Sequence, residues 1–285
     1  MRFYQLISLI FIALCAYNCY QEDDIEAEVI PYKRTAWYDT TSTNKVVKFV
    51  SKYYYNYDRF FITDPDSSDY LYNFQSKYSD LKVTYPKQED EHLWNGCEYV
   101  QTLLLDYYSD EFIRKHFPYS LILTDGILDP LFKLPLDCFV GRYFGMITIY
   151  NLDELGAEEK KILSCKLHEM VWTYIGSYDG VLDLPNEFFR FGSGYYGTYD
   201  MGKEWSLEEL YEKGFAVNKL EGWGMTGFPS EGEDIGYWIS FLIRTADDEI
   251  ERILNTYEAM RVKHDYLVQQ LAKLGIDYKQ LRYTE

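Results

Sequence analysis

The stretch KILSCKLHEMVWTYIG, residues 161–176, matches the zinc-binding pattern H-E-x-x-H at all but its last position. In that pattern the two histidines lie four residues apart on one helix face, so both imidazoles bind one zinc ion, and the glutamate takes a proton from the zinc-bound water. His168 and Glu169 keep the first two positions, but Trp172 stands at the last. An indole N–H offers a metal no lone pair. Two interpretations stay open: a zinc site that has lost a ligand, and a chance His-Glu pair on an amphipathic helix.

Composition limits the classes of function. The chain has 285 residues, of which 47% are hydrophobic, enough for one large core or two closely packed lobes. Its formal net charge of −18 opposes binding to nucleic acid, because a phosphate backbone is recognised by a basic surface. The same charge opposes direct binding to anionic lipid. Aromatic residues make up 19% of the chain, and such rings either fill a core or form platforms for sugars or peptides.

The N-terminus has the features of a secretory signal. Arg2 precedes an apolar run from Leu6 to Leu14, which is too short to span a bilayer. Two cysteines, Cys15 and Cys19, follow this run. The acidic segment QEDD at 21–24 resembles the export tag of Bacteroidetes surface lipoproteins.

These features predict a lipoprotein signal peptide over residues 1–19, with Cys19 as the acylated residue, and a flexible leader over 20–43. We expect an exported protein at the cell surface, held to the outer membrane only through its lipid. Acylation of Cys15 is one alternative. An ordinary cleaved signal without lipid is the other.

From residue 44 onward the pattern of strands and helices predicts one α+β domain over 44–285. The order is several strands and then the long helix that carries His168, which we expect to end at Gly176. This is the order of a zincin catalytic domain, in which the last strand forms the edge that holds a peptide substrate. Expected helices cover 44–56, 97–117 and a long amphipathic unit over 247–276, and expected strands cover 58–64, 119–126, 138–140 and 144–150.

A second functional helix is expected to begin near SEGED, residues 230–234. Ser230 is its predicted N-cap, and Glu233 follows three residues later as in a capping box. A zincin of the Glu-ligand type takes its third zinc ligand from such a helix. Glu233 is therefore either a metal ligand or a capping residue.

The ordered motifs resemble a known family. They are a Cys-x-x-E-D-D-I leader, DEFIRKHFPYSLILTDG, LHEMVWTYIG, GFAVNKLEGWG before GEDIGYWISFLI, and the ending LAKLGIDYKQLR. Together they resemble the zinc-binding metallopeptidase family of Bacteroidetes surface lipoproteins over nearly the whole mature chain. The resemblance implies a zincin-like fold, with a small mixed sheet and an active-site helix followed by a helical C-terminal lobe. It also implies that His168 is the first zinc ligand, Glu169 the general base and Glu233 the third ligand.

The chain departs from this family at two positions. Trp172 replaces the second ligand, and Tyr237 replaces the second glutamate of a Glu-Asp-x-x-Glu helix start. A catalytic zinc needs three protein ligands, so we predict weak or absent zinc binding, a vestigial Glu169 and little or no peptidase activity. The remaining cleft is expected to bind a peptide or protein. The alternatives are a glycan-binding or assembly component of a surface nutrient-uptake system, and an active zinc peptidase with an atypical ligand set.

Other conspicuous residues have simpler interpretations. The odd, widely spaced set Cys97, Cys138 and Cys165 argues against a disulfide framework. Cys165 is expected to pack in the core, against the alternative of a catalytic pair with His168. The other histidines, His92, His116 and His264, are expected away from the cleft. The aromatic clusters at 53–57 and 192–199 are either structural or a binding platform.

Overall fold

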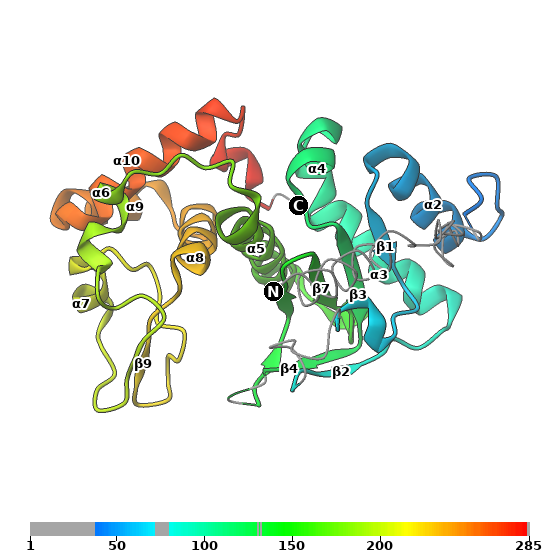
Figure 1. Ribbon diagram of the computed structural model, residues 1–285, viewed down its shortest axis with the longest axis horizontal. Helices are drawn as coiled ribbons and strands as arrows, with labels where there is room; N and C mark the ends of the chain where they lie inside the picture. The colour runs from blue at the N-terminus through cyan, green and yellow to red at the C-terminus, as the bar shows by residue number, and fades with distance from the viewer. Residues whose placement is uncertain (1–37, 72–79, 130, 132, 284–285) are drawn as a thin grey trace, which may run out of the picture. The chain divides into compact units, whose positions relative to one another are not determined.

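The computed structural model describes residues 38–71, 80–129, 131 and 133–283 (Figure 1). Contacts divide the chain into two units, Met1–Tyr38 and Asp39–Glu285, and the second contains every element named below. The predicted signal peptide, with Cys15 and Cys19, lies outside the described residues. Among the described helices, none combines the length and hydrophobicity that a membrane crossing requires.

The main sheet has four strands and lies on one side of the long helix α5 (Figure 1). In spatial order the strands are β1 (Phe60–Ile62), β3 (Ser120–Thr124), β7 (Phe144–Thr148) and β6 (Cys138–Val140). β1, β3 and β7 are parallel. Every residue of β3 is buried, as expected for an interior parallel strand.

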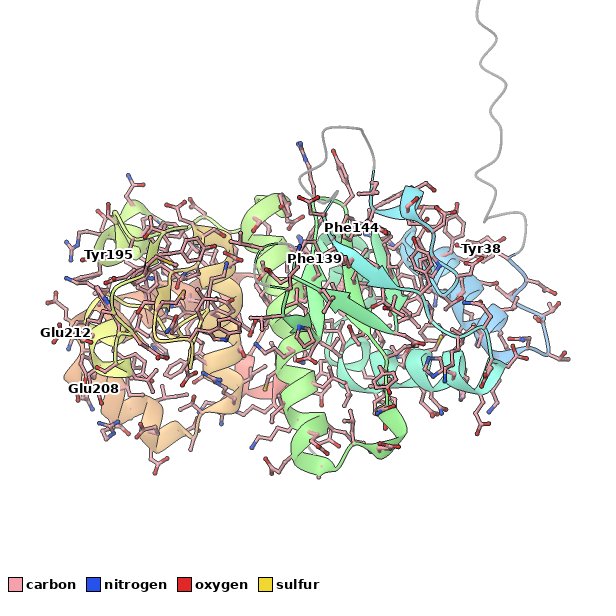
Figure 2. All side chains as sticks on the ribbon, turned by 90° about the horizontal axis from the view of Figure 1, so that it is seen from below. Tyr38, Phe139, Phe144, Tyr195, Glu208 and Glu212 are labelled. Carbon is pink, nitrogen blue, oxygen red and sulfur yellow. The ribbon has the colours of Figure 1, made fainter. Side chains whose placement is uncertain are left out.

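The edge strand beside α5 is β6, which runs antiparallel to β7. The expectation that the last strand before the helix forms this edge was wrong, because β7 pairs with strands on both sides. The chain passes first along the edge and then turns back, with the Gly141 N–H donating to the Phe144 carbonyl at 2.9 Å. The ring of Phe139 on β6 stacks on that of Phe144 (Figure 2). A short hairpin therefore sets the position of the edge.

Two smaller antiparallel sheets complete the β structure. One contains β2 (Lys82–Thr84), β4 (Gly126–Leu128) and β5 (Pro135–Leu136). The other pairs β8 (Tyr199–Asp200) with β9 (Thr226–Gly227), in the helical C-terminal part of the unit.

The helices confirm the predicted α+β class and the predicted capping box of the second functional helix, where Ser230 and Glu233 each accept a backbone hydrogen bond of the other. Their bounds are α2 (Lys45–Tyr57), α3 (Asp90–Leu103), α4 (Asp110–His116), α5 (Ala157–Tyr174), α6 (Asn186–Phe189), α7 (Leu207–Glu212), α8 (Glu231–Arg244), α9 (Asp247–Thr256) and α10 (Glu258–Lys273).

Two predicted helices are each divided in the structure. The expected helix over 97–117 is split into α3 and α4, because the backbone leaves the helical region at Leu104 and Ser109 caps a new helix by accepting from the Phe112 N–H at 3.2 Å. The expected unit over 247–276 is split at Tyr257, whose backbone is extended. The apolar spacing continues through both breaks, so the periodicity concealed them.

The predicted end of α5 at Gly176 was also wrong. The chain continues through a π-helical turn over Ile175–Asp179 and leaves the helix at Gly180, whose φ is 72°. Gly176 serves close packing, because a Cβ atom there would lie 2.7 Å from Ile235 Cδ1 of α8. The glycine was correctly taken as a structural residue but with the wrong function.

The axes of α5 and α8 approach closely, and α5 lies between α8 and the sheet (Figure 1). Gly232 and Gly236 of α8 face α5, four residues apart on one helix face. A Cβ atom at Gly236 would lie 2.5 Å from the Glu169 carbonyl oxygen, and one at Gly232 would lie 2.9 Å from Ser177 Cα. This contact brings the next residues of α8, Glu233 and Tyr237, to the same pocket as Glu169.

Candidate binding cleft

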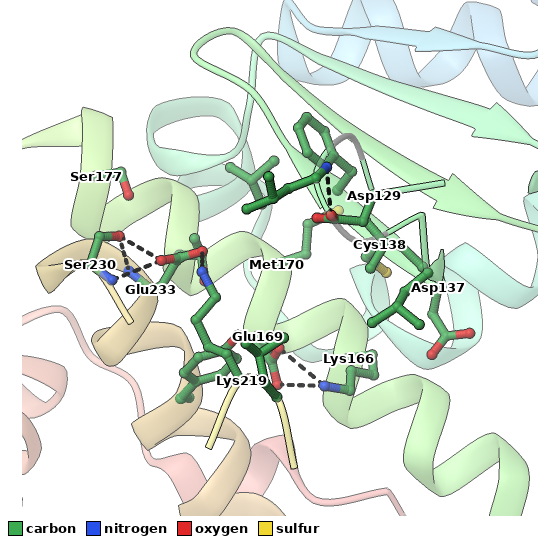
Figure 3. A pocket seen from close by; sticks show the side chains of 18 of the residues that line it. Asp129, Asp137, Cys138, Lys166, Glu169, Met170, Ser177, Lys219, Ser230 and Glu233 are labelled. Carbon is green, nitrogen blue, oxygen red and sulfur yellow. Dashed lines mark hydrogen bonds and ion pairs between the residues drawn. The ribbon is translucent and has the colours of Figure 1, made fainter. Parts of the chain in front are cut away.

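A pocket of about 710 Å³ lies where α5, α8 and the edge strand β6 meet (Figure 3). The segment from Asp129 through β5 and β6 forms one wall, and α5 forms another. The start of α8, together with Tyr199 and Lys219, closes the remaining side. The lining combines apolar residues, among them Leu134, Leu136 and Met170, with six charged ones.

The face of α5 that lines this pocket is not the face that carries the sequence motif. It presents Lys166, Glu169, Met170, Thr173 and, just beyond the helix, Ser177. These positions follow the spacing of three and four residues expected for one side of a helix. His168 and Trp172 each come one residue before a pocket-facing position, and one residue corresponds to a rotation of about 100° around the helix. They therefore belong to a different face of α5.

His168 and Trp172 both lie in the core, each with no exposed surface. The Trp172 Nε1–H donates to the Tyr108 hydroxyl at 2.9 Å, and that hydroxyl lies 2.8 Å from His168 Nδ1. The hydroxyl accepts from the indole, and in its second bond either the hydroxyl or Nδ1–H is the donor, according to the tautomer of the imidazole. His168 Nε2 has no hydrogen-bond partner among the described residues.

Burial lowers the pKa of His168 to about 3, so the ring is neutral at physiological pH. It also packs edge-on against the Tyr107 ring at 5.1 Å between centroids. Nδ1 is engaged by Tyr108, and the whole ring is enclosed in the core and absent from the pocket lining. His168 is therefore a core residue.

The substitution His168→Asn is expected to make the fold less sensitive to acid. The ordinary histidine pKa is 6.5 and the folded value is about 3, so below pH 6.5 the unfolded state binds a proton that the folded state does not. Stability should then fall with pH by up to roughly 1.4 kcal/mol per unit, a loss that the variant avoids. Asparagine still offers Tyr108 an acceptor. Urea unfolding of both proteins between about pH 7 and pH 4 measures the difference, and parallel losses would contradict the assignment.

Glu169 is the motif residue that reaches the pocket. Both of its carboxylate oxygens lie 3.2 Å from the Lys166 ammonium, one turn earlier on the same helix (Figure 3). Burial raises the pKa of Glu169 above its ordinary value, against the opposing effect of Lys166. The carboxylate is thus already paired with a cation of the chain itself.

Glu233 enters the pocket from α8 and is also paired. Its Oε1 accepts from the Lys219 ammonium at 2.7 Å, and its Oε2 accepts from the Ser230 N–H at 2.8 Å and the Ser230 hydroxyl at 2.9 Å. Burial would raise the pKa of Glu233, but Lys219 and Ser230 outweigh it and the pKa is lowered. The capping interpretation of Glu233 is confirmed, and both of its oxygens are in use.

The structure does not bring the predicted zinc ligands together in one place. Glu169 and Glu233 line one pocket, whereas His168 points into the core and Trp172 bonds to Tyr108. In the described part of the chain, no group of three or more His, Cys, Asp or Glu side chains has an arrangement suited to a metal ion. The residues present therefore do not fit the zinc centre that the motif implied. The pocket-facing pairs of α5 at the i, i+4 spacing are Lys166 with Met170 and Glu169 with Thr173, and neither contains a histidine.

Sequence reasoning missed three residues that define the pocket. Lys166 could have been found, because it precedes Glu169 by three residues on one helix face. Lys219 and Cys138 carry no local signal, since they come from a loop and from the edge strand. Burial raises the pKa of the Cys138 thiol well above its ordinary value, and the charges of Asp137 and Glu169 add to this.

Cys97, Cys138 and Cys165 are free thiols, and Cys165 is buried as expected. The other three histidines are absent from the pocket lining. Tyr53 is buried against Phe61, and the rings of Tyr195 and Tyr196 pack against the core formed by Leu210, Phe215 and Phe228. These tyrosines are structural.

Comparison with known proteins supports the fold alone. The sequence matches no protein-family model and no curated protein. The structure is similar to a solved bacterial one. That structure is a "putative zinc-binding metallo-peptidase" from Bacteroides caccae, with a TM-score of 0.52 and 14% sequence identity, covering 86% of this chain and 92% of that chain. The chain thus has a fold distantly related to that of the Bacteroides caccae protein.

Proposed function

We propose that this protein binds extended peptides in the cleft beside β6 and does not hydrolyse them with zinc. One observation carries the proposal: the two glutamates of the pocket are each paired with a lysine ammonium of the chain, at 3.2 Å for Glu169 and 2.7 Å for Glu233. A divalent ion would have to displace these cations. The pocket lining also contains no histidine in the described part of the chain.

The edge strand supports the peptide part of the proposal. In the antiparallel ladder, Asp137, Phe139 and Gly141 face β7, as shown by the bonds from Thr148 N–H to the Asp137 carbonyl and from Gly141 N–H to the Phe144 carbonyl. Hydrogen-bonding direction alternates along such a strand. The backbone N–H and C=O groups of Cys138 and Val140 therefore point away from β7. In the described part of the chain they have no hydrogen-bond partner.

An unpaired edge beside a pocket is suited to strand addition. A bound peptide would gain main-chain hydrogen bonds from Cys138 and Val140, and its alternate side chains would enter the pocket. This mode needs neither a metal nor a nucleophile. It explains how a cleft without zinc ligands can still act on peptides as a receptor.

The substitution Val140→Pro is expected to weaken peptide binding at least about fivefold, because it removes an outward N–H worth about 1 kcal/mol net and places a ring where the peptide backbone would lie. The ladder to β7 stays intact, since Val140 does not donate to it. Fluorescence anisotropy with the best peptide from an immobilised array measures the change.

The matched control is Val140→Ala, which shortens the same side chain and keeps the N–H. It should bind within about twofold of the wild type, since a surface substitution usually costs under 0.5 kcal/mol. Equal affinities of the proline and alanine variants would show that β6 does not pair with the ligand. An array without any binding peptide would remove the proposal altogether.

A glycan ligand is the second candidate, favoured by Trp223. Trp223 is 48% exposed. The N–H groups of the flanking Gly222 and Gly224 both donate to the Glu204 carboxylate, which holds this turn in place. Exposed indole faces stack on sugars. Binding on a glycan array that is lost in Trp223→Ala, without peptide binding, would favour this function.

The location belongs to the proposal as well. We propose that Cys19 carries a lipid and that the protein works at the outer surface, on the grounds of the short apolar run and the acidic QEDD segment. Resistance of the protein to protease added to intact cells would contradict this.

A further inference from the structure

We infer that the preferred ligand is a peptide with a basic side chain, lysine or arginine, that enters the pocket beside Asp137 and Glu169. The inference rests on the proposed function, because it assumes that a peptide pairs with β6. It adds the chemical class of the residue that the pocket selects.

The first ground is the charge of the pocket. Its described lining holds four carboxylates, Asp129, Asp137, Glu169 and Glu233, against two ammonium groups, Lys166 and Lys219, which leaves an excess of two negative charges. Both lysines are already directed at glutamates. An entering cation therefore meets a negative potential, whereas an entering carboxylate is repelled.

The second ground is the place of Asp137. It is the residue before β6, its side chain is exposed, and its carbonyl is fixed by the Thr148 N–H at 2.8 Å. Asp137, Cys138 and Glu169 line the same pocket, and the pKa of the Cys138 thiol is raised by burial and by the charges of both carboxylates, against the opposing charge of Lys166. A peptide paired with Cys138 and Val140 would place a side chain at this point.

The third ground is the whole chain. A net charge of −18 attracts a basic peptide over a longer range than the pocket alone and repels an acidic one. This attraction is screened by salt, but the part that comes from a half-enclosed pocket is screened less. The preference for a basic residue should therefore decrease with ionic strength and still remain measurable at about 0.15 M.

The experiment uses three matched Thr/Val-rich extended peptides that differ at one central residue: lysine, norleucine or glutamate. Norleucine keeps the aliphatic stem of lysine without its charge. Anisotropy titrations should give the lysine peptide about tenfold higher affinity than the norleucine peptide, and the glutamate peptide the lowest. The substitution Asp137→Asn should reduce the lysine-to-norleucine ratio to about threefold or less.

The control for net charge is Glu212→Gln. Glu212 is exposed on α7, outside the pocket lining and far from Phe139 of β6 (Figure 2). The substitution Glu212→Gln removes the same charge as Asp137→Asn and should leave the lysine-to-norleucine affinity ratio unchanged. Equal binding of the lysine and norleucine peptides, or an equal effect of both substitutions, overturns this inference and leaves peptide binding standing. Failure of all three peptides to bind overturns both.

Discussion

The substitution Trp172→His is expected to bring no zinc into the protein and to destabilise its fold. The variant has a complete H-E-x-x-H sequence. Its new imidazole, however, lies in the core beside His168, and Glu233 remains in the pocket paired with Lys219. The substitution removes a fully buried indole and its hydrogen bond to Tyr108. We expect a loss of about 3 kcal/mol, at the lower end for large aromatic truncations.

Zinc binding is expected when the two histidines are instead placed one position later in α5. Glu169→His and Thr173→His put imidazoles four residues apart on the pocket face, where Glu233 supplies a third donor. A background substitution of Lys219→Ala frees the Glu233 carboxylate. This triple variant should hold close to one zinc per chain, against less than about a tenth for the wild type and for Trp172→His.

Mass spectrometry after dialysis measures the zinc content per chain, and urea unfolding measures the free energy of unfolding. Lys219→Ala alone is the control, since it opens Glu233 without adding an imidazole. Stoichiometric zinc in the wild type that is lost in His168→Ala would restore the active-peptidase alternative. Zinc gained by Trp172→His would show that positions 168 and 172 face the pocket after all.

The orientation of α5 about its own axis is the feature that the sequence did not predict. The sequence predicted α5, its position after the strands and the capping of α8 correctly, because each depends on local residues such as Ser230 and Glu233. It did not predict which face of α5 meets the pocket. Buried apolar residues, such as Leu167, Met170 and Trp172, occur around much of the helix, because the sheet and α8 cover it from two sides. No single polar stripe marks the functional side.

Lys219 and Cys138 were missed for a related reason. Lys219 bonds to Glu233, fourteen positions later in the chain, and Cys138 comes near Glu169 only through the packing of β6 on α5. Such pairs depend on tertiary contacts, which one sequence does not reveal. The edge strand was assigned to β7 instead of β6 because strand order in space need not follow chain order.

Gly236→Ala is expected to destabilise the protein and to disrupt the cleft, although alanine is the better helix former by about 1 kcal/mol. Its methyl group would lie 2.5 Å from the Glu169 carbonyl oxygen and would also meet Thr173 Oγ1. The carbonyl belongs to helix backbone and cannot rotate away, so α5 and α8 must separate. Overpacking of this kind costs typically 1–3 kcal/mol and occasionally more, and we expect about 3 kcal/mol. Peptide affinity should fall with it, because the shift moves Glu233 away from Glu169.

A second substitution identifies which contact is responsible. Thr173→Ala removes the hydroxyl from the path of the new methyl group but leaves the Glu169 carbonyl in place, so Gly236→Ala should remain destabilising in that background. The control Gly202→Ala adds a methyl group whose nearest neighbour lies 3.6 Å away, and it should change the free energy of unfolding by less than about 0.5 kcal/mol. Rescue by Thr173→Ala would assign the cost to a side chain that can adjust. Persistent loss would show that the close approach of two helix backbones holds the pocket together, and that glycine is required at this position for packing.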